Sequence, residues 1–359
     1  MLSNEAIRQQ VENLLSQMTL EEKAAQMVQV PYTVVGREEA LRWAKLGAGS
    51  FLHVLGDDAR EVQQAALHSR LGIPVLFGID AIHGHGLNEH ATIFPSQLAC
   101  ACAWDKDIAR EMGEVTAREV ATDGLHWTFS PVLCLGRDTR WGRVDETFGE
   151  DPYLVSVMGA ASVRGYQGRD FSEPGRVLSC VKHFVGGSQP VNGTNGSPTD
   201  LSERTIREIF FPPFKAGIDA GAYSMMTAHN ELNGIPCHAN RWLMEDVVRG
   251  EWGFEGFIVS DWMDVEHIHD LHRTATDNKD AFRQSVNASM DMHMHGPQFY
   301  EKVIELVKEG AVSESAVNRA CLKILTAKFK LGLFENPYTD TEQTSKSVFT
   351  EKHRATAYE

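Results

Sequence analysis

The chain has 359 residues, of which 42% are hydrophobic and 23% are charged, enough for one large core or two ordinary ones. Lys and Arg total 34 against 49 Asp and Glu, so the net charge of −15 disfavours nucleic acid and anionic membranes as partners. No stretch approaches the ~20 apolar residues that span a bilayer, and the N-terminal segment lacks the pattern of a leader peptide. We therefore expect a soluble protein.

The cysteines lie in apolar stretches, without CxxC pairs or histidines at metal-ligand spacing. We interpret them as buried free thiols, which favours a reducing compartment. A cytoplasmic location follows if Met1 is native, and a periplasmic or secreted one if a leader has been removed. The six cysteines are Cys100, Cys102, Cys134, Cys180, Cys237 and Cys321.

Short apolar segments alternate along the chain with amphipathic segments of helical periodicity. The expected strands are Gln26–Val30, Gly49–Leu55, Pro74–Asp80, His126–Leu135, Val177–Phe184, Ala222–Asn230, Gly256–Asp261 and Ser289–His293. The expected helices include Asp58–Leu71, Asp105–Thr122, Leu154–Gly165, Ser202–Ala220 and Arg241–Trp252. Eight such alternations are typical of a TIM-like (β/α)8 barrel, which we predict for residues 1–335.

Local signals support this pattern. Thr19–Glu22 has the sequence of a capping box, and Gly332 is placed to end a long helix. From Asn336 the composition becomes polar and irregular. We predict that residues 336–359 are a linker and the start of a following segment, which leads towards a second domain not contained in the chain.

Polar residues end several of the expected strands. Asp80, Lys182, His183, His229 and Asp261 each follow an apolar run. A single carboxylate there can cap a helix and a single basic residue can pair with a neighbour. Since the active site of a (β/α)8 barrel lies at the carboxyl ends of the strands, together they predict one polar rim suited to a sugar.

Other motifs do not predict a cofactor. His83, His85 and the segment Met292–His295 lack the spacing of a metal site, so we expect no metal. The chain has no Walker or dinucleotide-binding sequence. We interpret the glycine-rich segment Gly186–Gly196 as a mobile loop near the site.

Seven segments, in this order along the chain, resemble family 3 glycoside hydrolases, in particular the β-glucosidase branch. They are Gly78–Gly84, Thr92–Pro95, Arg137–Arg143, Phe148–Pro152, Lys182–Phe184, Asn230–Gly234 and Gly253–Trp262. The resemblance implies that Asp261 is the nucleophile. It also implies that the terminal sugar is bound by Asp80, Arg143, Lys182 and His183, and that Trp262 forms a wall of the pocket.

Two departures from the family pattern affect the prediction. Many members carry Tyr or Phe where this chain has His229, which we include among the substrate-binding residues. The branch that uses N-acetylglucosamine has a His/Asp acid dyad on the loop after the Lys-His pair. This chain lacks that signature after Phe184, so an N-acetylglucosaminidase is disfavoured.

We therefore predict a retaining β-glucosidase that acts on β-glucosides and cello-oligosaccharides through a glycosyl-enzyme on Asp261. A β-xylosidase or arabinosidase, and a sugar-binding barrel that is inactive without its second domain, remain alternatives. Glu150 and Asp151 are better explained as the acidic start of a helix near Pro152. We expect the general acid/base to come from a C-terminal domain or a second chain.

Overall fold

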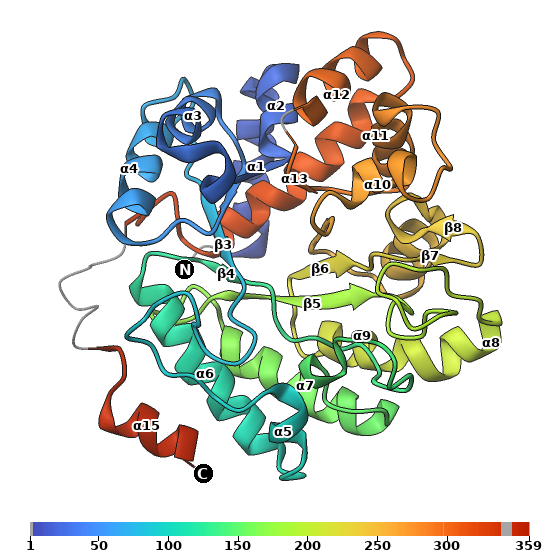
Figure 1. The fold of residues 1–359 in the computed structure, drawn as a ribbon. Coiled ribbons are helices and arrows are strands. Elements are labelled where there is room, and N and C mark those ends of the chain that lie inside the picture. Colours follow the sequence, from blue (N-terminus) through green and yellow to red (C-terminus); the bar gives the residue numbers. More distant parts are fainter. Residues whose placement is uncertain (1–2, 297, 339–346, 359) are drawn as a thin grey trace. The chain divides into compact units, whose positions relative to one another are not determined.

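The computed structural model describes residues 3–296, 298–338 and 347–358 (Figure 1). The chain divides into two compact units. The first unit is Met1–Gly78 with His238–Thr339, and the second is Ile79–Cys237 with Asp340–Glu359. Eight parallel strands follow one another in chain order and alternate with helices, which confirms the predicted (β/α)8 class.

The first unit contains the N-terminal and C-terminal strands of the barrel. Its elements are α1 (Asn4–Gln17), α2 (Leu20–Gln26), β1 (Val28–Pro31), α3 (Tyr32–Leu46), β2 (Ser50–Leu52), α4 (Gly56–Leu67), β3 (Leu76–Ile79, whose last residue belongs to the second unit), η4 (Trp242–Glu251), β9 (Phe257–Val259), α10 (Asp264–Asp270), α11 (Asn278–Asn287), β10 (His293–Met294), α12 (Gln298–Lys308) and α13 (Glu314–Lys330). β1 pairs in parallel with β10 and β2, and β2 pairs with β3. Val259 of β9 bridges Met292, next to β10.

Both helix signals predicted in this unit are confirmed. The N–H of Glu22 donates to Thr19 Oγ1 at 3.3 Å, and the N–H of Thr19 donates to Glu22 Oε2 at 2.9 Å. Gly332 follows the end of α13 with a φ of +70°, which favours glycine. Side chains of α1 and α13, including Val11 and Leu325, share one buried cluster.

The second unit contains the central strands. Its elements are α5 (Gln97–Ala101), α6 (Lys106–Thr122), β4 (Trp127–Thr128), η1 (Val144–Glu146), α7 (Pro152–Gln167), β5 (Leu178–Phe184), α8 (Glu203–Thr205), η2 (Ile206–Phe210), α9 (Phe211–Asp219), β6 (Ser224–Thr227), the hairpin β7 (Glu231–Leu232) and β8 (Ile235–Pro236), and α15 (Glu351–Tyr358); the short turn η3 (Cys237–Ala239) lies at its border with the first unit. β5 pairs in parallel with β4 and β6, and the N–H of Phe129 donates to Ile79 O of β3. α6 and α7 can pack closely because Gly165 of α7 has no side chain. A Cβ at this position would lie only 2.2 Å from Arg110 O of α6.

Several predicted elements differ from the structure. The strand expected over His126–Leu135 is only Trp127–Thr128, because the hydrogen bonds to β5 become unevenly spaced after it. The N–H groups of Leu178, Cys180 and Lys182 donate to the carbonyls of His126, Ser130 and Pro131. The helix expected over Ser202–Ala220 is divided into α8, a π turn and α9, whose start contains two prolines without N–H donors.

Two further elements have other forms or bounds. The segment expected as an α-helix over Arg241–Trp252 is the π-helix η4. The last strand is His293–Met294 instead of Ser289–His293. In both cases the element exists where the sequence predicts it, and only its type or its bounds are wrong.

A buried carboxylate anchors α15 on α6. Glu119 accepts hydrogen bonds from the N–H and Oγ1 of Thr92, at 2.6 and 2.8 Å, and from the N–H of Phe349 at 2.9 Å. His353 Nδ1 lies 2.7 Å from the same carboxylate. The predicted linker lies largely outside the described residues, because 339–346 are not described, and the domain boundary at 335 stays a prediction.

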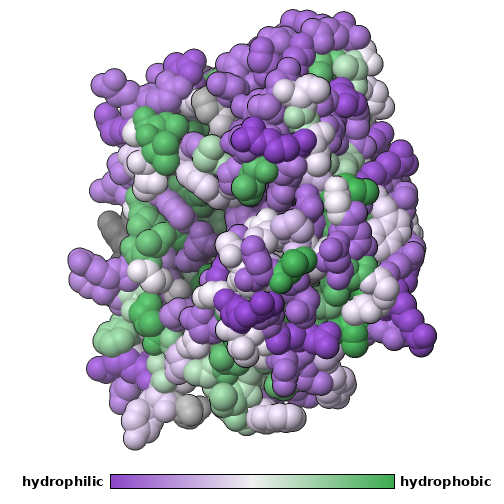
Figure 2. Space-filling view, turned by 45° about the vertical axis from the view of Figure 1, so that its right-hand side comes forward, coloured by the Kyte–Doolittle hydropathy of each residue, from purple (hydrophilic) through white to green (hydrophobic). Residues whose placement is uncertain are grey.

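The cysteines are free, as predicted, and five of the six are buried. Cys102 is exposed, which corrects the prediction, because it lies at the end of the short helix α5. Hydrophilic side chains predominate on the face drawn in Figure 2. Within the described part of the chain, no helix combines the length and the apolar character that a membrane span requires.

Candidate active site

Six of the seven predicted site residues lie at or just after the carboxyl ends of strands, and the seventh, Arg143, directly precedes η1. In the second unit, Asp80 follows β3, Lys182 and His183 belong to the end of β5, and His229 follows β6. In the first unit, Asp261 and Trp262 lie just after β9. The two groups are described in turn.

Asp80 and Lys182 form an ion pair. Lys182 Nζ lies 2.8 Å from Asp80 Oδ1, and the lysine side chain is only 4% exposed whereas that of Asp80 is 41% exposed. The ammonium group also lies 5.9 Å from the centre of the Phe129 ring. The buried lysine thus fixes the carboxylate, whose exposed surface can accept hydrogen bonds from hydroxyl groups.

Arg143 connects Glu146 to His183. Its Nε and Nη2 each donate to the carboxylate of Glu146 at 2.8 Å, and Nη2 lies 3.1 Å from His183 Nε2. Because a guanidinium group only donates, this ring nitrogen of His183 accepts. His183 is therefore a neutral imidazole held in a defined orientation.

Cys134 and His229 flank His183. The backbone N–H of His183 donates to Cys134 Sγ at 3.3 Å, and burial raises the pKa of that thiol to about 11, so it stays protonated. The rings of His183 and His229 stack with centroids 5.8 Å apart. His229 is half-buried, which places an aromatic surface beside His183.

The three arginines of the segment Arg137–Arg143 make different contacts. Arg140 forms an ion pair with Asp138 and its side chain is 62% exposed. Arg137 lies over the ring of Phe210. Arg143, in contrast, contacts the predicted site residue His183. Asp151 accepts from the N–H of Leu154 at 2.7 Å as the N-cap of α7, which confirms its structural interpretation.

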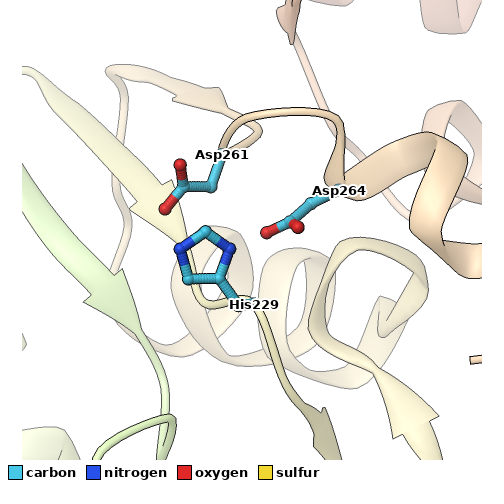
Figure 3. A group of neighbouring side chains, drawn as sticks. All are labelled: His229, Asp261 and Asp264. Carbon is cyan, nitrogen blue, oxygen red and sulfur yellow. The ribbon is translucent and has the colours of Figure 1, made fainter. Parts of the chain in front are cut away.

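Asp261 and Asp264 lie on the segment that joins β9 to α10 (Figure 3). Asp261 is 9% exposed, and its Oδ1 accepts the N–H of Trp262 at 2.6 Å. Its own N–H donates to Nε2 of the buried His238 at 3.0 Å. The N–H of Trp262 thus orients the carboxylate, and the hydrogen bond to His238 holds the backbone of Asp261 in place.

Asp264 is an almost fully buried acid at the first position of α10. Its Oδ1 lies 2.8 Å from His267 Nδ1. Its Oδ2 lies 3.7 Å from His238 Nε2, but that nitrogen accepts the N–H of Asp261 and carries no proton, so this contact is not an ion pair. His238 and Asp264 support the Asp261 segment from the first unit's interior.

Trp262 stacks on His295, the residue after β10. The ring centroids are 4.3 Å apart with an angle of 10° between the planes. Trp262 is 36% exposed. One face of the indole is covered by the imidazole, and the exposed part of the ring can contact a ligand.

The glycine-rich segment is tied to the loop that carries Arg143. Trp141 Nε1 donates to Asn195 Oδ1 at 2.9 Å, and the N–H of Val191 donates to Pro198 O at 2.9 Å. The predicted mobility of this segment stays a prediction.

The sequence did not identify several of these residues. Glu146 stands three residues after Arg143, a spacing that places both on one helical turn, and it could have been recognised. Asp264 stands three residues after Asp261 and could likewise have been recognised. Cys134, His238 and His295 have no such signal, because tertiary folding alone brings them to the site residues.

In the second unit, the buried ammonium group of Lys182, the partly exposed carboxylate of Asp80 and the oriented His183 fit a neutral ligand with many hydroxyl groups. Residues 19–327 match the family model described as the glycosyl hydrolase family 3 N-terminal domain. The chain belongs to family 3 of the glycosyl hydrolases.

Relatives of this family are similar over most of the chain. A periplasmic beta-glucosidase of Salmonella typhimurium is 37% identical over 92% of this chain and 43% of its own length. A beta-xylosidase of Formosa agariphila is 35% identical over 99% of this chain and 47% of its own length. The structure of a beta-glucosidase from Listeria innocua in complex with glucose matches with a TM-score of 0.91 at 38% identity, covering 98% of this chain and 50% of the other. The chain therefore spans about half the length of the relatives it matches.

Proposed function

We propose that this chain is the catalytic barrel of a retaining β-glucosidase, which releases terminal β-D-glucosyl residues through a covalent glycosyl-enzyme on Asp261. The observation that carries the proposal is the carboxylate of Asp261 at the end of β9, with Oδ1 bonded to the N–H of Trp262 at 2.6 Å. A hydrogen bond from a backbone N–H favours the ionised carboxylate. Such a carboxylate can attack the anomeric carbon of a sugar.

The second unit would bind the sugar's hydroxyl groups. The ion pair of Asp80 and Lys182 offers acceptors on one side and ammonium donors on the other. Arg143 and His183 add a guanidinium and an imidazole, and His229 adds a second ring beside His183. Contacts that strengthen as the oxocarbenium-like transition state forms would lower the barrier.

We further propose that the general acid/base comes from outside residues 1–359, from a following domain or a second chain. A retaining hydrolase needs a second carboxyl group about 5–5.5 Å from the nucleophile. Asp151 is committed to capping α7. The relatives are about twice as long as the part they share with this chain. Their remaining residues are enough for another domain, which could carry this carboxyl group.

A β-xylosidase is the second candidate, because the Formosa agariphila relative with that name covers 99% of this chain. The two sugars differ by one hydroxymethyl group, a difference worth about 1–3 kcal/mol in a pocket. A panel of nitrophenyl β-glucoside, β-xyloside and α-arabinoside, assayed with the full-length protein, distinguishes the substrates. The proposed enzyme prefers the glucoside.

A 2-fluoro β-glucoside with a dinitrophenyl leaving group tests the nucleophile directly. We expect mass spectrometry of the digested protein to find the fluoroglucosyl group on Asp261, and Asp261→Asn to abolish the labelling without changing thermal unfolding. Glu150→Gln is the matched control and should be labelled like the wild type. Labelling of another carboxylate would refute the assignment, and glucose binding without any labelling would favour a sugar-binding barrel.

A further inference from the structure

Trp262 and His295 stack so that the imidazole covers one face of the indole. The nearly parallel rings, 10° apart in plane and 4.3 Å apart at their centroids, are in contact across one face of the indole. Trp262 nevertheless keeps 36% of its surface exposed. A ligand can therefore approach the indole only from the parts that His295 leaves uncovered.

The position of His295 is fixed by the residues around it. Its φ of +67° is unusual for a residue with a side chain and requires support from its surroundings. Gly296 follows without room for a side chain, since a Cβ would lie 2.3 Å from Glu266 Oε1. Glu266 in turn lies 3.0 Å from His293 Nε2, and the His293 ring stacks on Phe299 with centroids 4.5 Å apart.

The stack consists of two uncharged rings at neutral pH. Burial lowers the pKa of His295, and the neighbouring His293 of β10 lowers it further, whereas Glu266 of α10 raises it. The net direction is downward, so the imidazole becomes protonated only in acid. An uncharged imidazole can lie flat on the indole without a charge that needs solvation.

We propose that His295 is a positioning residue for sugar binding, which holds the indole of Trp262 in one orientation and leaves its uncovered surface as the wall against which a pyranose ring packs. This role rests on the proposed function, because it takes the ligand of Trp262 to be the sugar. His295 itself does not touch the sugar. It fixes the plane of the Trp262 indole, which does contact the sugar. A Trp262 side chain that rotated freely would lose this fixed orientation.

The stack can be tested in the 359-residue chain without any activity. A protonated imidazole in contact with an indole quenches its fluorescence, whereas a neutral one does so weakly. We expect the wild-type emission to fall on acidification below pH 6.5, the ordinary pKa of histidine. The chain has six other tryptophans, so the drop is compared between proteins, and we expect it to be smaller than in the wild type, by the same amount, in both Trp262→Phe and His295→Phe. A drop of wild-type size in either variant would show that the rings are not in contact.

The positioning role has a separate test. His295→Asn removes the ring but tolerates the positive φ, and His295→Phe keeps a ring that can stack. Because aromatic pairs contribute about 0.5–1.5 kcal/mol, we expect His295→Asn to weaken glucose binding, measured by calorimetry, about two- to tenfold. His295→Phe should restore the affinity.

The same difference between His295→Asn and His295→Phe should appear with the 2-fluoro glucoside. His295→Asn should raise the concentration that gives half-maximal labelling of Asp261 by the same factor and leave the maximal rate within about twofold. Unchanged affinity in His295→Asn, or equal losses in the Asn and Phe variants, would overturn the proposal. If the wild type binds no glucose while the fluorescence changes occur, the proposed function fails and the stack stands.

Discussion

The ammonium group of Lys182 lies 2.8 Å from Oδ1 of Asp80, so the ends of β5 and β3 are joined by an ion pair whose lysine is buried and whose carboxylate is partly exposed. Removing the carboxylate has two effects. It takes away a group proposed to bind hydroxyls, and it leaves a buried cation without this partner.

We expect Asp80→Ala to reduce glucose binding strongly and to lower the free energy of unfolding by about 1–3 kcal/mol. The double variant Asp80→Ala/Lys182→Met should recover much of the stability, because no buried charge remains, but not the binding. Thermal unfolding and calorimetric titration with glucose measure the two effects. A double variant that binds glucose like the wild type would contradict the role of this pair.

Arg143→Lys should weaken substrate binding although it keeps the charge. Lysine cannot reproduce the two parallel bonds to Glu146 together with the bond to His183 Nε2, so the imidazole loses its fixed orientation. We expect the KM for nitrophenyl β-glucoside to rise about tenfold in the full-length protein, where misplacement of a binding group is costly. Arg140→Lys, in the same motif, is the control and should change KM less than twofold, because the Arg140 side chain is 62% exposed.

Leaving-group chemistry tests whether residues 1–359 lack the acid/base. Without a proton donor, only a leaving group that needs no protonation departs readily. The isolated chain should therefore react slowly with dinitrophenyl β-glucoside and hardly at all with cellobiose, as followed by absorbance and by glucose release. Cleavage of cellobiose at ordinary rates by the pure chain would place the acid/base within these residues.

Lys328 gives a prediction about stability and pH. It is buried in α13 with its Nζ donating to Gln26 Oε1 at 2.7 Å, and burial lowers its pKa to about 7 from 10.5. Between these two values the unfolded chain binds more protons than the folded one, so stability rises with pH. Relative to Lys328→Met, the wild type should gain on the order of 3 kcal/mol between pH 7 and pH 10, measured by urea unfolding. Parallel pH profiles for the two proteins would show that Lys328 is not the source.

The sequence predicts most of the barrel because each strand and helix has its own local pattern. The order of the strands and the polar residues at their ends, Asp80, Lys182 and Asp261, follow from that pattern alone. The short β4 was missed because the apolar run over His126–Leu135 continues past Thr128, where the hydrogen bonds to β5 become unevenly spaced. Hydrophobicity does not record such a change of register.

The supporting residues of the site were harder to predict. His238 stands 23 residues before Asp261 and His295 stands 33 residues after Trp262, so neither pair shares a local period. Their contacts depend on how loops leave neighbouring strands. Sequence reasoning therefore identified residues at strand ends better than the residues that orient them.

The carboxylate of Glu119 accepts hydrogen bonds from Thr92 and Phe349 and contacts His353, which lie 27, 230 and 234 residues away along the chain. The amide hydrogens of Thr92 and Phe349 thus share one acceptor group, and release of the C-terminal helix would deprive the loop after β3 of part of its support. Hydrogen–deuterium exchange should accordingly find these two amides in a single cooperative opening event. The loop that begins at Asp80 and the helix that begins at Glu351 would then behave as one dynamic unit.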